Sequence, residues 1–155
     1  MIGVVLAGGK SSRFHGKPKG LELLGGMPLA LHVARALEHL CSQVVIECAR
    51  DAGYETLWME MIHGLTAHAG KGPLAGIAAG LERGKLEDGV AFAPCDMPLI
   101  TPEVLQRLVL ETSGAYARSP AGIEPLVCVL RGGALDVVER LLALTAIPRV
   151  VALHE

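Results

Sequence analysis

The chain has 155 residues, of which 51% are hydrophobic and 19% are charged, with a formal net charge of −2. This composition excludes disordered, collagenous and coiled-coil chains, and the charge provides no overall basic field for binding nucleic acid or an anionic membrane. No apolar run is long enough to span a bilayer, and the first apolar run lacks the preceding basic segment of a signal peptide. We therefore expect a cytoplasmic protein.

The first half of the chain predicts two strands and two helices around a polar loop. Ile2–Ala7 is apolar and β-branched, which is typical of a buried strand that ends in a glycine turn. Residues 8–20 form the loop. Pro28–Leu40 has apolar residues at helical spacing, Gln43–Cys48 resembles a second buried strand, and we expect Ala52–Met61 to be helical.

The second half continues the alternation of helices and strands. After the breaker residues 70–73, Leu74–Glu82 predicts an apolar helix and Gly89–Ala93 a third strand. Thr101 and Pro102 are suited to the N-cap and first turn of a helix that reaches about Leu110. The remaining predicted elements are two strands, a helix and a short final strand: Gly114–Ser119, Leu126–Leu130, Ala134–Leu144 and Arg149–Leu153.

Strands that alternate with helices of about ten residues indicate an α/β fold. We expect a single doubly wound, mainly parallel sheet with helices on both faces, in a Rossmann-like arrangement. Ligands of such sheets bind outside the carboxyl ends of the strands. Gly8 and Gly9 follow the first predicted strand and Asp96 follows the third, so both should lie at this edge.

The loop after the first strand is the most informative segment. It carries Lys10, Arg13, Lys17 and Lys19 within ten residues, and no acidic residue occurs before Glu22. Glycines allow backbone N–H groups to approach an anion closely, and basic side chains add charge-assisted hydrogen bonds. This combination favours a polyphosphate site.

Two other phosphate motifs do not fit this loop. It lacks the G-x-G-x-x-G dinucleotide pattern, and a P-loop that ended in Gly9-Lys10-Ser11 would need a glycine where Val4 stands. An ordinary solvated basic loop remains an open alternative.

Asp96 stands between Pro94 and Pro98, which stiffen the turn after the third strand. Mg²⁺ needs only one or two carboxylates beside phosphate oxygens and water, so Asp96 is a candidate ligand. The alternative is a turn residue that caps the next element. Glycines at 72, 76 and 80 would share one helix face, which favours either tight packing or contact with a ligand.

Together these segments resemble the molybdenum cofactor guanylyltransferases over residues 1 to about 150. The likeness rests on the Leu-Ala-Gly-Gly loop with its later lysine, the Gly72–Gly76 helix start, the Cys95–Pro98 turn and the segment Ile123–Val127. The resemblance implies transfer of GMP from GTP to the molybdopterin cofactor, with Mg²⁺ and release of pyrophosphate. The glycine loop alone marks only the wider nucleotidyltransferase superfamily.

The resemblance also implies roles for individual residues. Asp96 would hold Mg²⁺, and Lys19 and Arg13 would bind phosphates, which makes these three the expected catalytic residues. The expected nucleotide-binding residues are Leu6, Ala7, Gly8, Gly9, Lys19, Gly72, Pro73 and Asp96.

Several departures from the family pattern keep other functions open. Pro18 precedes the lysine as in cytidylyl and sugar-nucleotide relatives, Glu47 stands near the usual asparagine, and Leu65 stands near an expected acidic residue. We expect residues 1–155 to form one nucleotidyltransferase domain without the family's closing Asn-x-Asn-Thr-Pro segment. The alternatives are a transferase that uses CTP or a sugar phosphate, and a nucleotide-binding regulator or scaffold. Molybdoenzymes and pathway proteins are further candidate partners.

Overall fold

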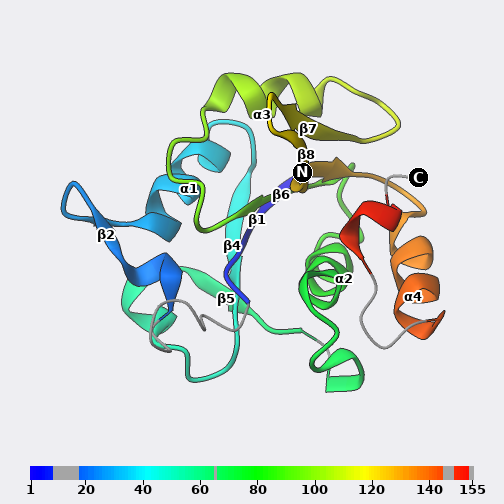
Figure 1. Cartoon of the computed structure of the whole chain (residues 1–155), viewed down its shortest axis with the longest axis horizontal. Helices are drawn as coiled ribbons and strands as arrows, with labels where there is room; N and C mark the ends of the chain where they lie inside the picture. The colour runs from blue at the N-terminus through cyan, green and yellow to red at the C-terminus, as the bar shows by residue number, and fades with distance from the viewer. Residues whose placement is uncertain (9–17, 65, 145–148, 154–155) are drawn as a thin grey trace.

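A computed structural model describes residues 1–8, 18–64, 66–144 and 149–153, and its centre is a six-stranded sheet (Figure 1). The strand order is β5-β4-β1-β6-β8-β7. Neighbours in the series β5-β4-β1-β6 are parallel, while β8 is antiparallel to both β6 and β7. The strands are β1 (Ile2–Leu6), β4 (Gln43–Glu47), β5 (Glu60–Ile62), β6 (Val90–Pro94), β7 (Ala115–Ser119) and β8 (Gly122–Leu130).

Helices cover both faces of this sheet. Helices α1 (Leu29–Glu38) and α3 (Pro102–Val109) lie on one face, and α2 (Pro73–Arg83) and α4 (Ala134–Leu144) lie on the other (Figure 1). The predicted α/β fold with a mainly parallel sheet is therefore confirmed. The smaller elements are the hairpin β2 (Leu23–Leu24) and β3 (Met27–Pro28) and the 3₁₀ turns η2 (Lys19–Leu21), η3 (Tyr54–Leu57), η4 (Thr66–His68) and η5 (Val150–Leu153).

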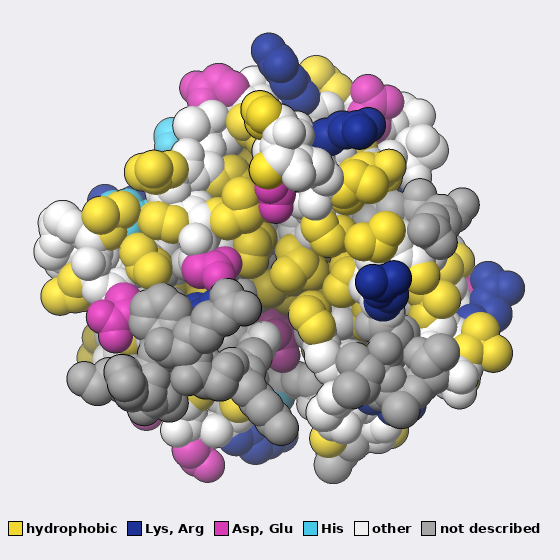
Figure 2. Space-filling view, in the orientation of Figure 1, with side chains coloured by type: hydrophobic (Ala, Val, Ile, Leu, Met, Phe, Trp, Pro, Cys, Tyr) yellow, Lys and Arg dark blue, Asp and Glu magenta, His cyan; other side chains and the backbone are white. Residues whose placement is uncertain are grey.

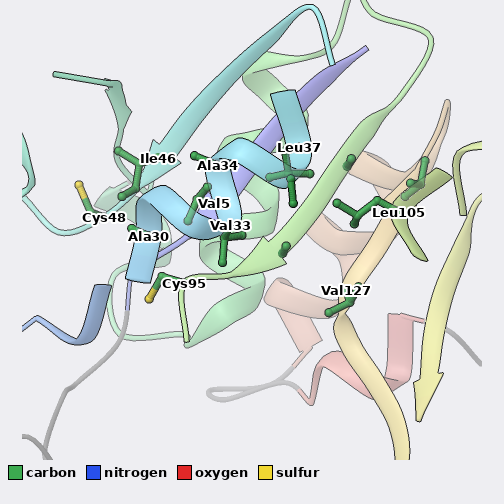
Figure 3. Packing of buried hydrophobic residues seen from close by; sticks show 14 of the residues in the cluster. Val5, Ala30, Val33, Ala34, Leu37, Ile46, Cys48, Cys95, Leu105 and Val127 are labelled. Atoms are coloured by element: carbon green, nitrogen blue, oxygen red, sulfur yellow. The ribbon is translucent and has the colours of Figure 1, made fainter. Parts of the chain in front are cut away.

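The sheet separates two apolar clusters. On the α1 side, Ala30, Val33 and Leu37 pack toward Val5 and Ile46 (Figure 3). Their helical spacing places them on one side of α1, which explains the periodicity in the sequence. Because the α2 side holds a second cluster of equally buried side chains, β1 is buried along its whole length and has no alternating pattern.

The prediction of a helix over Ala52–Met61 is wrong. The segment forms the short turn η3 and then β5, which pairs in parallel with β4. Gly53 and Trp58, which flank η3, both have left-handed backbone conformations, with φ of 85° and 56°. A regular helix cannot pass through such residues, and the apolar spacing in the sequence does not reveal them.

The prediction of a final strand over Arg149–Leu153 is also wrong. Val150–Leu153 is the 3₁₀ turn η5, and Val150 and Leu153 pack against the cluster on the α2 side. These apolar residues thus pack on the face of the sheet, beside α4, and do not form an edge strand.

The predicted start of the helix at Thr101 and Pro102 is confirmed, since Thr101 is the N-cap of α3 and Pro102 lies in its first turn. Within the described residues, no helix combines the length and apolar content that crossing a membrane requires.

Candidate functional site

Three parallel strands end in line at one edge of the sheet. Leu6 at the end of β1 pairs with Glu47 of β4 on one side and with Pro94 of β6 on the other. The ladder continues one residue further, because the Ala7 N–H donates to the Glu47 carbonyl at 2.7 Å and the Cys95 N–H to the Leu6 carbonyl at 3.0 Å. This register fixes where the chain leaves each strand.

The chain runs from β1 to β4 on one side of β1 and later returns to β6 on the other side. The carboxyl ends of β1 and β6 therefore flank a topological switch point, where open α/β sheets bind ligands. Gly8 follows β1 at this point and Asp96 follows β6. Gly8 and Asp96 therefore lie where the fold rule places a ligand.

Lys19 and Asp96 meet at this edge although 77 residues separate them. Lys19 opens the turn η2, and its Nζ lies 3.4 Å from Oδ2 of Asp96. The two side chains are 30% and 46% exposed, so both are accessible to a ligand. The structure thus joins an accessible cation and an accessible carboxylate.

A buried tyrosine positions η2. The Gly20 N–H donates to the Tyr54 hydroxyl at 3.1 Å, and a Cβ atom on Gly20 would lie only 2.7 Å from that oxygen. Gly20 must therefore remain a glycine for the turn to pack against Tyr54. This contact holds the residue after Lys19 and so fixes the direction from which the lysine approaches Asp96.

A cavity of about 130 Å³ opens between these groups. Its walls come from the ends of β1, β4 and β6, the start of α2, the turn η2 and β8. The lining residues are Leu6, Ala7, Gly8, Lys19, Glu47, Pro73, Pro94, Cys95, Asp96 and Leu126.

Most of the site residues expected from the sequence surround this cavity. Gly72 stands one residue before Pro73 as the N-cap of α2, with a φ of 72°, but it does not line the cavity. Gly9 and Arg13 lie outside the residues that the structure describes. The other expected residues all line it: Leu6, Ala7, Gly8, Lys19, Pro73 and Asp96.

Glu47 is a part of this cavity that sequence reasoning did not propose as a site residue. It is only 7% exposed, and its Oε2 accepts a hydrogen bond from the Gly8 N–H at 3.2 Å. Burial raises the pKa of the Glu47 carboxyl, and the N–H groups of Gly8 and Gly64 and the nearby His63 offset that rise only in part. Two signals in the sequence could have found it: a carboxylate at the end of a buried strand, and its place near the asparagine that the family usually has.

Two glycines leave the space that the Glu47 carboxylate occupies. A Cβ on Gly8 would lie 2.5 Å from Oε2 of Glu47, and a Cβ on Gly76 would lie 2.6 Å from the same atom. The carboxylate therefore fills the gap between the loop after β1 and the first turns of α2. Gly80, one turn further along α2, instead makes room for the Phe92 ring. Both helix glycines serve close packing.

The described part of the cavity contains one thiol, that of Cys95, and one accessible carboxylate that could hold a metal ion, that of Asp96. Burial raises the pKa of the Cys95 thiol to about 11, so it stays protonated at neutral pH and is a poor nucleophile. The described residues contain no group of three or more His, Cys, Asp or Glu side chains that could form a complete metal cage. A single accessible carboxylate suits Mg²⁺, which keeps several waters and takes its other ligands from phosphate.

Comparisons with known proteins agree with this geometry. Residues 3–155 match the model of the family described as MobA-like NTP transferase domain. The molybdenum cofactor guanylyltransferase of Cupriavidus metallidurans is 34% identical over 148 residues, which cover 88% of this chain and 71% of the relative. The protein of the same name from Burkholderia ambifaria is 35% identical over 153 residues and covers 88% of this chain and 73% of its own length.

A solved structure shows the same likeness in three dimensions. The crystal structure of molybdopterin-guanine dinucleotide biosynthesis protein A from Archaeoglobus fulgidus superposes with a TM-score of 0.78 at 28% identity. The match covers 99% of this chain and 78% of that protein. Sequence and structure therefore point to the same group of proteins.

Proposed function

This chain belongs to the family of MobA-like NTP transferase domains, and we propose that it transfers GMP from GTP to the molybdenum–molybdopterin cofactor. The products are the guanine dinucleotide form of the cofactor and pyrophosphate. Family membership makes the chain a nucleotidyltransferase, and the names of its relatives support guanylyl transfer. The observation that carries the proposal is the approach of Lys19 to Asp96 at the cavity that Gly8 also lines.

The reaction is an in-line displacement at phosphorus. An oxygen of the cofactor's terminal phosphate attacks the α-phosphorus of GTP, and the bond to the oxygen that bridges to the β-phosphate breaks. The negative charge that this leaves on pyrophosphate must be neutralised, and the reacting groups must be held in line. Neither task requires a covalent intermediate with the protein, which is consistent with a protonated Cys95 thiol.

The site residues expected from the sequence each have a place in this scheme. The Lys19 ammonium would donate hydrogen bonds to phosphate oxygens and offset their charge. Arg13, outside the described residues, would assist Lys19 on the departing pyrophosphate. The nucleotide would contact Leu6, Ala7 and Gly8, with further contacts from Gly9, Gly72 and Pro73.

Asp96 would hold Mg²⁺, for which its half-exposed carboxylate and the neighbouring cavity leave room. When bound there, Mg²⁺ supplies charge that polarises the phosphate oxygens. The distance of 3.4 Å between Lys19 Nζ and Asp96 Oδ2 is longer than a strong charged hydrogen bond, so the pair can open for a ligand at little cost.

A substrate panel tests this function. The full chain is incubated with Mg²⁺ and GTP, CTP or ATP, with and without molybdopterin released from a molybdoenzyme, and pyrophosphate is measured. We expect release that requires both GTP and the acceptor and that equals the dinucleotide formed. Turnover with CTP instead would assign the chain to the cytidylyl alternative. Nucleotide binding without any turnover would favour the regulator or scaffold, and absence of binding would contradict all three.

A further inference from the structure

A second and larger hollow adjoins the nucleotide cavity. Its volume is about 450 Å³, and Asp96 lines both spaces. We call it the β8 pocket. Its lining residues are Asp96, Met97, Pro98, Leu99, Ile100, Thr101, Val104, Ala117, Arg118, Ser119, Glu124 and Val127. Figure 2 shows hydrophobic side chains gathered over the middle of the face that is seen in Figure 1.

An irregularity in β8 forms the wall between the two spaces. Tyr116 of β7 pairs with Cys128, but the next residue, Ala117, pairs with Glu124, so three residues of β8 bulge out of the ladder. Pro125 begins this bulge, and proline has no N–H to donate to a ladder. Of the bulged residues, Leu126 lines the nucleotide cavity and Val127 lines the β8 pocket. The same distortion therefore shapes both sites.

The bulge also places the Glu124 side chain in the largely apolar β8 pocket, which Asp96 and Arg118 line as well. The Ser119 hydroxyl donates to Oε1 of Glu124 at 2.8 Å and accepts a hydrogen bond from the Ala121 N–H at 3.2 Å. This fixes the Glu124 carboxylate, which has about four lone-pair positions. Among the described residues, the Ser119 hydroxyl donates to one of its two oxygens, so the carboxylate has capacity for further donors.

We propose that the β8 pocket binds the pterin ring of the acceptor and that Glu124 recognises the ring's amino-oxo edge. This rests on the proposed function, in which the acceptor is a molybdopterin. A pterin is flat with two apolar faces, and one edge presents two neighbouring donors, a ring N–H and an amino group. A fixed carboxylate accepts from both donors at once, while Met97, Ile100 and Val127 provide apolar contact.

The position of the pocket supports this occupant. The acceptor phosphate must reach the α-phosphate of the nucleotide, so the rest of the acceptor must lie next to the nucleotide cavity and outside it. The β8 pocket satisfies both conditions because it shares only Asp96 with that cavity. Its volume also lies within the range of small-molecule sites, roughly 300–1,000 Å³.

The test uses 6-hydroxymethylpterin, a fluorescent and stable probe, and the matching lumazine, in which a carbonyl replaces the amino group. Both are titrated into the wild-type chain, Glu124→Gln and the control Glu103→Gln, whose carboxylate is exposed on α3 outside the pocket. We expect Glu124→Gln to bind the pterin about ten- to a hundredfold more weakly, since it loses hydrogen bonds to a charged acceptor. Glu103→Gln should match the wild type, and the wild type should prefer pterin to lumazine.

Calorimetry with GTP and Mg²⁺ on the same proteins separates this inference from the proposed function. We expect GTP affinity to be unchanged in Glu124→Gln. Because guanine carries the same amino-oxo edge, a loss of GTP affinity in this variant would show that the pocket holds the nucleobase and would overturn the inference. Equal pterin affinity in Glu124→Gln and wild type, or no pterin binding by a chain that binds GTP, would also overturn it.

A second variant covers the case in which Glu124→Gln is unstable. Ala117→Leu fills the β8 pocket from β7 without changing a charge. It should abolish pterin binding while GTP binding persists, and pterin binding at wild-type affinity would exclude this pocket. If the wild type binds the pterin as expected but transfers no GMP in the substrate panel, the pocket stands and the proposed function fails.

Discussion

Two carboxylates stand at the ends of β4 and β6, on either side of β1, at the same edge of the sheet, and they differ in almost every other property. Asp96 follows β6, is 46% exposed and lies 3.4 Å from a lysine ammonium. Glu47 ends β4, is 7% exposed and accepts a hydrogen bond from the Gly8 N–H. Placement at the carboxyl end of a parallel strand is therefore not sufficient to make a metal ligand. What separates the two residues is whether a ligand can reach the carboxylate from solvent.

The largest effect should follow from changing the exposed carboxylate. Asp96→Asn retains the size of the side chain but removes its charge, so we expect a loss of at least a hundredfold in pyrophosphate release. A loss of about a hundred- to a thousandfold corresponds to about 2.7–4 kcal/mol of transition-state stabilisation. The transition in thermal unfolding should stay unchanged, because the residue is half exposed. Pyrophosphate release and thermal unfolding are measured on the same preparation of the variant.

Asp88→Asn provides the matched control for this change. Asp88 is also exposed but lies before β6, at the opposite end of the strand. It should leave turnover unaltered. Full activity in Asp96→Asn would remove this residue from the mechanism and would leave the site without its proposed metal ligand.

The cation beside Asp96 should have the next largest effect. Lys19→Ala removes the ammonium that we propose binds phosphate, and it should lower kcat/KM for the nucleotide about ten- to a hundredfold. Lys85→Ala, an exposed lysine that pairs with Glu82 on the surface, is the control and should change nothing. If Lys19→Ala binds and turns over the nucleotide as the wild type does, Lys19 serves only to hold Asp96.

The contrast between these carboxylates also shows what a sequence can and cannot predict. The mainly parallel sheet and the convergence of Lys19 with Asp96 followed from apolar runs, breakers and the rule for switch points. The left-handed Gly53 and Trp58 did not follow, because backbone conformation at single residues decides η3. The burial of Glu47 depends on the register of β4 and on space left by two glycines, which only three-dimensional packing reveals.

Gly76 tests how firmly the buried carboxylate is held. Alanine in a helix interior is normally about 1 kcal/mol more stabilising than glycine. Here its Cβ would lie 2.6 Å from Oε2 of Glu47, which cannot move without loosening its hydrogen bond to Gly8. We therefore expect Gly76→Ala to destabilise the wild type by about 1–3 kcal/mol in urea unfolding. In a Glu47→Ala background the same change should stabilise, because the obstructing group is gone.

If Gly76→Ala changed the free energy of unfolding in the same direction in the wild type and in Glu47→Ala, this packing would be contradicted. A stabilising Gly76→Ala in the wild type would mean that the Glu47 side chain shifts at no cost. The buried carboxylate would then be no more constrained than Asp96, and the contrast between the two would be one of exposure alone.

The smallest effect is a pH dependence that arises from Glu47 itself. Burial raises the pKa of its carboxyl above the ordinary value of 4.5, so the folded state holds this proton more tightly than the unfolded state does. The protonated group therefore stabilises the fold fully below pH 4.5, and this contribution is lost as the pH rises through the folded pKa. We expect the free energy of unfolding of the wild type, measured relative to Glu47→Gln, to fall over that interval.

Glu60 is the control of opposite sign. Its hydrogen bonds with Arg83 lower the pKa of its carboxyl, so the stability that it provides is present above pH 4.5 and is lost as the pH falls through its folded pKa. The opposite outcome is a free energy of unfolding, relative to Glu47→Gln, that rises with pH. It would mean that the N–H groups of Gly8 and Gly64 stabilise the charged carboxylate of Glu47 by more than burial destabilises it. The carboxylate would then resemble an anion bound by backbone N–H groups.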